Sequence, residues 1–375
     1  MLGKRKVTIL CSGFGLGFYV PGLLLDYQLN RRNVETEVMV FENFIEQDKK
    51  EKINDSRRTY HDNFKMALLA SKIPNDIRNS LAFDQITDLI EQWKQEERQD
   101  FIVLSGHWVY ILDMLREQVE YPLNVHLIYV DSAPSPSWSN LMKYKADYAE
   151  HYREIWLYDS HTQEINYRIN VTEEPIVPYR ERSDRFLIHG GGWGMGTYQG
   201  KIPELEEHGI LLDIIAYDLR ETESTHPNNR FYMMDPAWNA WDKGANERYR
   251  LPPFSEIKAN IVPEFRTALE HHGSYDILKR AKGVISKPGG GTLIDSLASA
   301  TPMIFLEPFG KHEQKNTDLW LSHGLGIRYE DWKDSGYSLD LLEPIHHRLV
   351  EQKEAAKDYV DEFLESFSMT KKSIV

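Results

Sequence analysis

The stretch Ser286–Asp295, with the sequence SKPGGGTLID, decides how the second half of this 375-residue chain folds. It joins a short apolar segment, Ala281–Ser286, to a segment that favours a helix, Thr292–Ser299. The glycines between them permit positive φ angles and let a ligand approach the backbone closely. A helix that begins here presents unpaired N–H groups and a partial positive charge, both of which suit phosphate. We therefore expect a strand, an anion-binding turn and a helix.

Two more glycine clusters follow apolar segments in the same way. Gly13–Gly17 comes after Val7–Cys11, and Gly190–Gly196 comes after Phe186–His189. The order strand, loop, helix predicts parallel sheets, in which ligands bind at the carboxyl ends of the strands. Each cluster alone is also compatible with a mere tight turn. Three of them on two domain-sized units favour a ligand in the cleft between the units.

The remaining pattern fills two α/β units separated near 172–183, where Pro175, Pro178 and a charged cluster occur. In the first unit we expect a strand at Thr36–Phe41, an irregular excursion at 43–58, helices at Asn63–Lys72 and Phe83–Glu97, and strands at Phe101–Ser105, Val125–Val130 and Ile155–Tyr158. The first unit also has an expected helix at Phe18–Leu29. In the second unit we expect a helix at Lys201–His208, strands at Ile210–Tyr217, Phe231–Met234 and Met303–Leu306, a long loop at Pro236–Pro253, a helix at Asn316–His323, and helical structure over Leu339–Phe367.

Composition excludes several classes of protein. The net charge of −14 argues against non-specific nucleic-acid binding and against a broad basic face for anionic lipid. A single cysteine, Cys11, rules out an intramolecular disulfide and a Cys-rich metal site. No apolar window approaches 18 residues, so we expect no transmembrane helix and a cytoplasmic location. Six histidines show no metal-ligand spacing and are expected at solvated positions: His151, His161, His271, His272, His346 and His347. We expect no metal.

The first glycine loop could instead bind a dinucleotide. Gly13 and Gly15 fit such a fingerprint, and Glu42 at the end of the second strand could receive a ribose. Phe18, however, occupies the position of the third glycine, so the signal for NAD or FAD is weak. A P-loop ending in Gly-Lys-Ser/Thr is absent.

The third cluster and the segment after it carry groups suited to a sugar nucleotide. Asp295 lies one turn into the expected helix, where its carboxylate can accept hydrogen bonds from ribose hydroxyls. The segment Glu307–Asn316, EPFGKHEQKN, concentrates hydrogen-bonding groups at the carboxyl end of the next strand. Polyols such as sugars need several directional partners, and this segment supplies them.

These residues carry a family resemblance. The segment Ala281–Gly324 resembles the donor-binding half of the GT-B glycosyltransferases, nearest the bacterial cell-wall N-acetylglucosaminyltransferase that forms lipid II and its UDP-glycosyltransferase relatives. The positions that match the family pattern are Gly289, Thr292, Asp295, Pro302, Pro308, Phe309, Glu313 and Gln314.

The resemblance implies an α/β protein of the GT-B fold, with two Rossmann-like domains whose parallel sheets face each other across a cleft. Residues 1–178 would bind the acceptor and 179–350 the nucleotide sugar, and 351–375 would form a helix that crosses back to the first domain. It implies a hexosyltransferase that inverts the anomeric centre. The sugar would pass from a UDP- or TDP-sugar to a small-molecule or lipid acceptor, without a cofactor or a bound metal. A homodimer is compatible with this plan.

The resemblance also implies roles for particular residues. Asp295 would bind ribose, and Glu313 and Gln314 would contact the donor sugar. Phe254, in Pro-Pro-Phe, would lie at the base, and Lys287 or Lys311 could supply a cation. The residues implied at the diphosphate are Gly15, Gly17, Gly191, Gly192, Gly194, Gly290, Gly291 and Thr292.

One departure from the family leaves the catalytic base open. The family has a histidine where this chain has Phe18, and a phenyl ring cannot take a proton. His107 and Asp131, each after an expected strand, are the candidate bases; either could instead be a structural residue at the rim of the sheet. A UDP-sugar 2-epimerase and an inactive nucleotide-sugar-binding protein remain alternatives.

Overall fold

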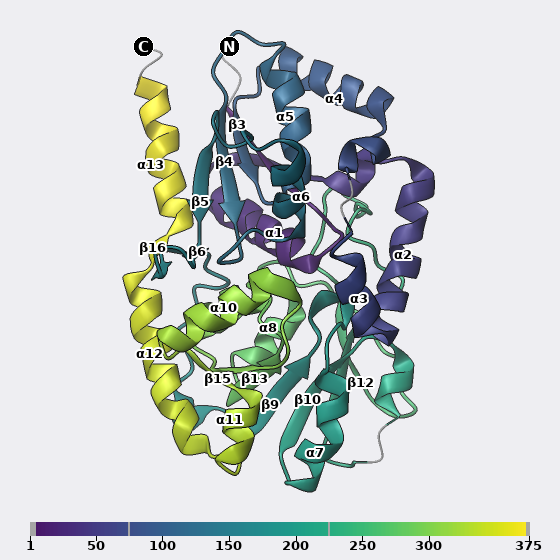
Figure 1. Cartoon of the computed structure of the whole chain (residues 1–375), viewed down its shortest axis with the longest axis vertical. Coiled ribbons are helices and arrows are strands. Elements are labelled where there is room, and N and C mark those ends of the chain that lie inside the picture. Colours follow the sequence, from purple (N-terminus) through teal and green to yellow (C-terminus); the bar gives the residue numbers. More distant parts are fainter. Residues whose placement is uncertain (1–4, 74–75, 224–225, 373–375) are drawn as a thin grey trace.

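The first half of the chain folds around a parallel sheet in the order β2-β1-β3-β4-β5 (Figure 1). The computed structural model describes residues 5–73, 76–223 and 226–372. The strands are β1 Lys6–Cys11, β2 Glu35–Val40, β3 Asp100–Val103, β4 Asn124–Tyr129 and β5 Arg153–Trp156. The helices are α1 Leu16–Arg31, α2 Gln47–Asp62, α3 Phe64–Ala70, α4 Phe83–Gln95, α5 Val109–Arg116 and α6 Pro136–Tyr144. Because β1 is central and covered on both faces, its run VTILC is almost wholly buried.

The second half repeats the plan in the order β12-β11-β10-β9-β13-β14-β15, and the β11–β12 pair alone is antiparallel among the pairs described in this sheet. Its strands are β9 Arg185–His189, β10 Leu211–Ala216, β11 Arg230–Met234, β12 Phe254–Ile257, β13 Gly283–Ser286, β14 Met303–Phe305 and β15 Gly326–Arg328. Its helices are α7 Ile202–Glu207, α8 Gly273–Leu278, α9 Gly290–Ser299, α10 Gly310–Ser322 and α11 Tyr329–Asp334. The predicted fold class, two Rossmann-like units with parallel sheets, is confirmed.

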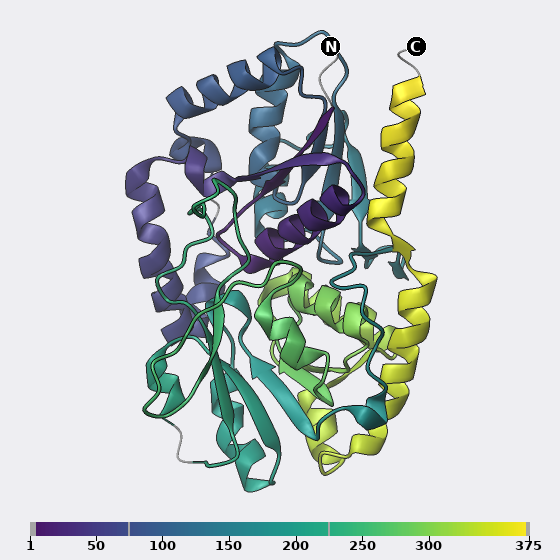
Figure 2. The same cartoon turned by 180° about the vertical axis from the view of Figure 1, so that it is seen from behind.

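The C-terminal segment runs along both halves. After α12, Leu342–Ala355, the chain breaks at β16, Lys357–Asp358, and continues as α13, Tyr359–Lys372. Figure 2 shows α13 beside the first sheet, where the Tyr359 hydroxyl lies 3.1 Å from His126 Nδ1 and Arg153 pairs with Glu362 at 2.6 Å. At the crossing, β16 pairs in parallel with the short strand β8, Tyr167–Arg168. The last three residues, 373–375, lie outside the described residues.

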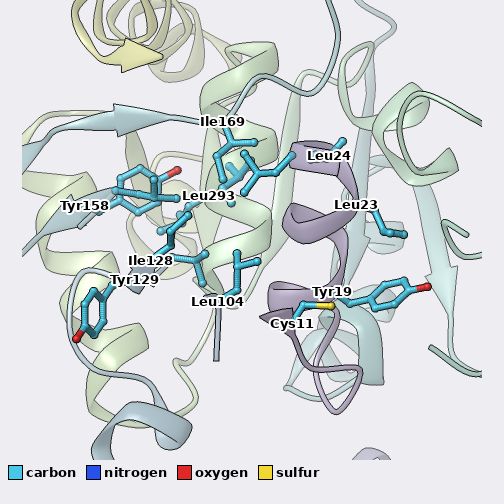
Figure 3. Close-up of a cluster of buried hydrophobic side chains, with 14 of the residues drawn as sticks. Cys11, Tyr19, Leu23, Leu24, Leu104, Ile128, Tyr129, Tyr158, Ile169 and Leu293 are labelled. Carbon is cyan, nitrogen blue, oxygen red and sulfur yellow. The ribbon is translucent and has the colours of Figure 1, made fainter. Parts of the chain in front are cut away.

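Apolar packing is continuous between the halves. Leu293 of α9 is fully buried, and Figure 3 shows it beside Ile169 and Tyr158 from the first half of the chain. Such burial contributes about 1.5–3 kcal/mol for each large apolar side chain. The shared core therefore fixes the carboxyl ends of β1 and β13, and the glycine loops that follow them, close together.

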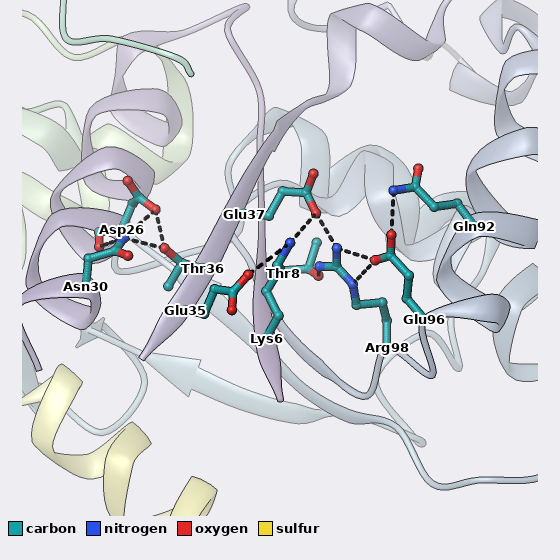
Figure 4. A network of polar contacts seen from close by, with 10 residues as sticks. All are labelled: Lys6, Thr8, Asp26, Asn30, Glu35, Thr36, Glu37, Gln92, Glu96 and Arg98. Carbon is teal, nitrogen blue, oxygen red and sulfur yellow. Dashed lines mark hydrogen bonds and ion pairs between the residues drawn. The ribbon is translucent and has the colours of Figure 1, made fainter. Parts of the chain in front are cut away.

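A polar network closes the opposite, amino end of the first sheet (Figure 4). Arg98 is 3% exposed at its side chain and pairs with Glu37 and Glu96, while it also donates to Thr8 Oγ1 at 2.9 Å. The polar groups of this network pair with one another. We therefore assign this end of the sheet a structural role.

Two of the expected elements are wrong. Residues 43–58, expected to be irregular, contain most of α2, whose polar sequence buries only Ile53 and His61 and so lacks an apolar stripe that would reveal it. The helix expected at Asn316–His323 begins six residues earlier, at Gly310. Among the described residues, no helix is long and apolar enough to cross a membrane.

The contact of α13 with the first sheet can be tested by truncating Phe363, which is fully buried against His126. Phe363→Ala should lower the free energy of unfolding by about 3–5 kcal/mol, because it removes a packed ring and leaves a cavity. Urea denaturation measures the change. Glu365→Ala, at an exposed position of the same helix, is the control and should change stability little. Equal stability of the two variants would contradict this packing.

Candidate functional site

A cavity of about 620 Å³ lies between the two halves, at the carboxyl ends of their central strands. That volume is within the range of about 300–1,000 Å³ that is usual for small-molecule sites. The expected site residues that line it are Gly15, Gly17, His107, Asp131, Gly191, Gly192, Phe254, Gly290, Gly291, Thr292, Asp295 and Glu313. Two expected residues do not line it: Gly194 and Gln314, whose amide donates to Asp318.

The N-termini of α1 and α9 face each other in this cavity. Gly15 precedes α1 and Gly289 precedes α9, and neither helix has a side-chain cap. A Cβ atom added to Gly291 would lie 3.4 Å from Gly17 Cα. Each helix start carries unpaired N–H groups and roughly half a positive charge. Their convergence creates a strongly anion-attracting point between the halves.

The glycines also allow the halves to approach each other. A Cβ atom on Gly290 would lie 2.5 Å from the carbonyl oxygen of Val130, and one on Gly192 would lie 2.5 Å from the side chain of Leu16. Both distances are shorter than any normal contact. The packing between the halves therefore requires glycine at these two positions.

Asp131 is tied to the second half rather than free in the cavity. Its Oδ1 accepts from the Gly290 N–H at 3.1 Å and from Asn316 Nδ2 at 2.8 Å. Asn316, fully buried, also donates to the Pro288 carbonyl at 2.8 Å and accepts from the Ser132 N–H at 2.7 Å. Burial raises the pKa of Asp131, against the effect of His312 and of the Asn316 hydrogen bond.

His107, unlike Asp131, has a buried side-chain atom without a hydrogen-bond partner in the described part of the chain. Its ring lies against Phe41, with centroids 4.9 Å apart, and its buried Nδ1 has no hydrogen-bond partner among the described residues. Burial lowers the pKa of His107 to about 4, so the imidazole is neutral near pH 7. A neutral imidazole that lines a cavity can accept a proton.

Asp295 contacts His272, a histidine that we expected at a solvated position. His272 is buried, and its Nε2 lies 3.0 Å from Asp295 Oδ1 while its Nδ1 lies 2.7 Å from Ser274 Oγ. Burial acts to lower the pKa of His272, but the Asp295 carboxylate outweighs it and the pKa is raised. The expectation that His271, His272 and His346 are solvated is wrong, because all three are buried.

Lys287 is a cation that lines the cavity beside the glycine loops. It pairs with Glu313, whose other oxygen accepts from the Phe309 N–H at 2.6 Å at the start of α10. A Cβ atom on Gly191 would lie 3.9 Å from Lys287 Nζ and one on Gly289 would lie 3.2 Å from it. The amine therefore lies between two glycine loops, whereas Lys311 is exposed and outside the cavity lining.

Glu42 organises the first glycine loop. Its carboxylate accepts from Ser12 Oγ at 2.7 Å, from the Gly13 N–H at 2.7 Å and from the Phe14 N–H at 2.8 Å. These bonds use the carboxylate that a dinucleotide-binding reading assigns to a ribose. The structure thus gives Glu42 a different role, that of shaping the loop before α1.

One contact that joins α2 to the second half, which we call the His61 clasp, was not predicted from the sequence. His61 of α2 lies 2.7 Å from a carboxylate oxygen of Glu221 through Nε2 and 2.8 Å from the Gly194 carbonyl through Nδ1. The Nδ1 atom donates to the Gly194 carbonyl, and the nearby Glu221 carboxylate favours the charged form of the imidazole. The three residues are 27 to 160 positions apart in sequence, and no local pattern reveals them.

No protein-family model matches the sequence, and no curated protein matches it. Solved structures match over almost the whole chain. The spinosyn rhamnosyltransferase SpnG is 13% identical over 96% of this chain and 100% of its own, with a TM-score of 0.57. The glycosyltransferase SnogD from Streptomyces nogalater is 11% identical over 98% and 99%, with a TM-score of 0.55. MurG from Acinetobacter baumannii is 11% identical over 97% and 99%, with a TM-score of 0.51.

These similarities establish the fold of the chain. SpnG, SnogD and MurG are glycosyltransferases of the GT-B fold, and this chain has that fold. Solved structures of SpnG with thymidine diphosphate and of VinC with dTDP are also similar, with TM-scores of 0.54 and 0.56. Among the described residues, no three His, Cys, Asp or Glu side chains are grouped so as to hold a metal ion.

Gly290 should not tolerate even a methyl group. Gly290→Ala should destabilise the protein by about 1–3 kcal/mol, because the added carbon overlaps the Val130 carbonyl and strains the contact between halves. Chemical denaturation measures the loss. Gly200→Ala is the matched control, since a Cβ atom there meets nothing within 4 Å. If both variants are as stable as the wild type, the halves do not meet at Gly290.

The His61 clasp should weaken as pH rises. Burial acts to lower the pKa of His61, but its bonds to Glu221 and Gly194 outweigh burial and raise the pKa above 6.5. The contribution of the clasp to the free energy of unfolding is therefore complete below about pH 6.5. It is lost as the pH rises through the pKa of His61 in the folded protein. At pH 6 the wild type should exceed His61→Gln by about 2 kcal/mol of unfolding free energy, and the gap should close towards pH 9. A pH-independent gap contradicts the clasp; exposed His151→Gln, the control, should show no gap.

Proposed function

We propose that this chain is a glycosyltransferase that moves a hexose from a UDP- or TDP-sugar to an acceptor bound by its N-terminal half. The observation that carries the proposal is the convergence of the α1 and α9 N-termini beside Lys287 and Asp295 in one cavity. Helix N-termini and a lysine are a general solution for binding phosphate. The TDP complexes of the similar structures SpnG and VinC support a nucleoside diphosphate as the ligand.

The donor would extend along the second half of the cavity. The base would lie at Phe254, whose ring stacks on Tyr232 at 5.9 Å and packs over Gly273. The ribose hydroxyls would donate to Asp295, which His272 orients. The diphosphate would take the amides of Gly291 and Thr292 with Lys287 as the cation, and no metal or further cofactor is proposed. The hexose would then reach Glu313, the one of the two expected sugar-contacting residues that lines the cavity.

The reaction would be a single displacement at the anomeric carbon. The acceptor oxygen or nitrogen attacks opposite the diphosphate, and the new bond forms as the bond to the diphosphate oxygen breaks and its electron pair leaves with the nucleotide. The acceptor proton passes to His107, and the anomeric centre is inverted. The helix N-termini and Lys287 stabilise the charge that develops on the leaving diphosphate.

The contacts favour His107 over Asp131 as the base. His107 lines the cavity and is neutral near pH 7. Asp131 has its Oδ1 engaged by Gly290 and Asn316, which suits a residue that positions α9. An imidazole of low basicity can still take the proton as the new bond forms in the transition state.

The donor site is tested by Asp295→Asn. The neutral amide cannot accept a charge-assisted hydrogen bond from the ribose, so affinity for UDP or TDP should fall about tenfold or more. Isothermal titration calorimetry measures the affinity. Asp318→Asn, at an exposed position of α10, is the control and should bind as the wild type does. Unchanged affinity in Asp295→Asn would remove Asp295 from the site, and the absence of any nucleotide binding by the wild type would remove the proposal.

Catalysis is tested with a panel of donors watched for nucleotide release and product formation. His107→Ala should keep its affinity for nucleotide while kcat falls by about 10²- to 10⁴-fold. Conversion of the donor without an acceptor would indicate a 2-epimerase instead. Nucleotide binding with no turnover of any donor would indicate an inactive binding protein.

A further inference from the structure

The N-terminal part of the cavity differs chemically from the part assigned to the donor. Part of its wall consists of alkyl and aromatic side chains from α1, from the residue after β2 and from the segment before α2: Phe18, Pro21, Leu24, Phe41 and Ile45. Polar side chains, among them Lys49 and Lys52 of α2, line the same part of the cavity. Phe18, which occupies the position of the family's histidine, thus belongs to an apolar surface.

Two helices cover this apolar part of the cavity. From α2, Ile53 and Tyr60 line it, and Ile53 is buried although α2 is otherwise a polar helix. From α3, Ala67 and Ala70 line it one turn apart, and their small side chains leave space beneath the helix. In Figure 1, α2 and α3 lie along one edge of the molecule, next to the contact between the halves.

The apolar surface continues outward at α3. Ile73 lines the cavity and is also 68% exposed, so it marks an opening to solvent. Met66 and Leu69 of the same helix are 48% and 58% exposed but do not line the cavity. A ligand with an apolar body can therefore enter past Ile73, which joins the cavity lining to the solvent-exposed surface.

We propose that this compartment, the part of the cavity beneath α2 and α3, binds the apolar body of the acceptor. The proposal rests on the proposed function and names the class of acceptor: a hydroxyl- or amine-bearing molecule with an extended alkyl or aromatic body. A polyol placed against these alkyl and aromatic side chains would bury hydroxyl groups without hydrogen-bond partners, which is unfavourable. The nucleophile would point inward to His107, whose ring lies against Phe41 at the inner end of the compartment.

The compartment can be tested without any donor, with the uncharged fluorescent probe N-phenyl-1-naphthylamine. The wild type should bind one probe saturably. Ala70→Phe should weaken the binding at least tenfold, because the ring fills the space beneath α3. Leu69→Phe adds a ring to the neighbouring outward position and should bind within twofold of the wild type. Melting curves of both variants establish that they are folded; non-saturable binding, or equal binding by the two variants, would overturn the proposal.

The link to the reaction is tested with a series of straight-chain primary alcohols as acceptors. The value of kcat/KM should rise about fourfold for each added methylene group until the compartment is full, as burial of methylene groups predicts. Ala70→Phe should shorten the optimal chain, and Leu69→Phe should not. A flat series, or a preference for glycerol and free sugars, would overturn the acceptor class.

The two proposals fail in different ways. If the probe binds as expected but UDP and TDP do not bind, the apolar compartment stands and the glycosyltransferase proposal falls. If nucleotides bind and the donor is turned over, but neither the probe nor the alcohols follow the size of residue 70, the acceptor class alone falls.

Discussion

Two helix N-termini, each carrying a partial positive charge, point at one another across the contact between the halves. Such an arrangement is repulsive unless a negative group lies between them. In this chain the Asp131 carboxylate accepts from the first amide of α9, and Asn316 holds that carboxylate in place. The position of the glycine loops and the closeness of the halves depend on this compensation.

One cavity therefore combines two environments. Its second-half wall is made of amides, a lysine and carboxylates held by partners, as Asp295 is held by His272. Its first-half wall, around Phe41 and Ile53, carries a cluster of alkyl and aromatic side chains beside polar ones. A reaction between a charged donor and an apolar partner needs both environments within bonding distance of each other, and the shared core around Leu293 keeps them adjacent.

The parts of this structure that could be predicted from the sequence are those whose pattern lies within one short segment of the chain. Strand β13, the glycines and α9 follow one another within SKPGGGTLID, so apolar runs and turn residues were sufficient to place them. Helix α2 could not be found, because it is polar and is held by distant contacts rather than by a stripe of its own. The partners of Asp131, Asp295 and His61 are 23 to 185 residues away, so their pairing arises only when the chain is folded.

The crossing of the chain at β8 and β16 has a mechanical consequence. Two backbone segments pass between the halves side by side and are hydrogen-bonded to each other, which makes the junction stiffer than a single strand would be. If one half rotates relative to the other, an axis through that junction disturbs these hydrogen bonds least. In Figure 1 the junction and α2 lie at opposite edges of the molecule, so a few degrees of rotation displace α2 the furthest. The His61 clasp thus lies far from this axis, so it resists such a rotation more effectively than the same contact would closer to the axis.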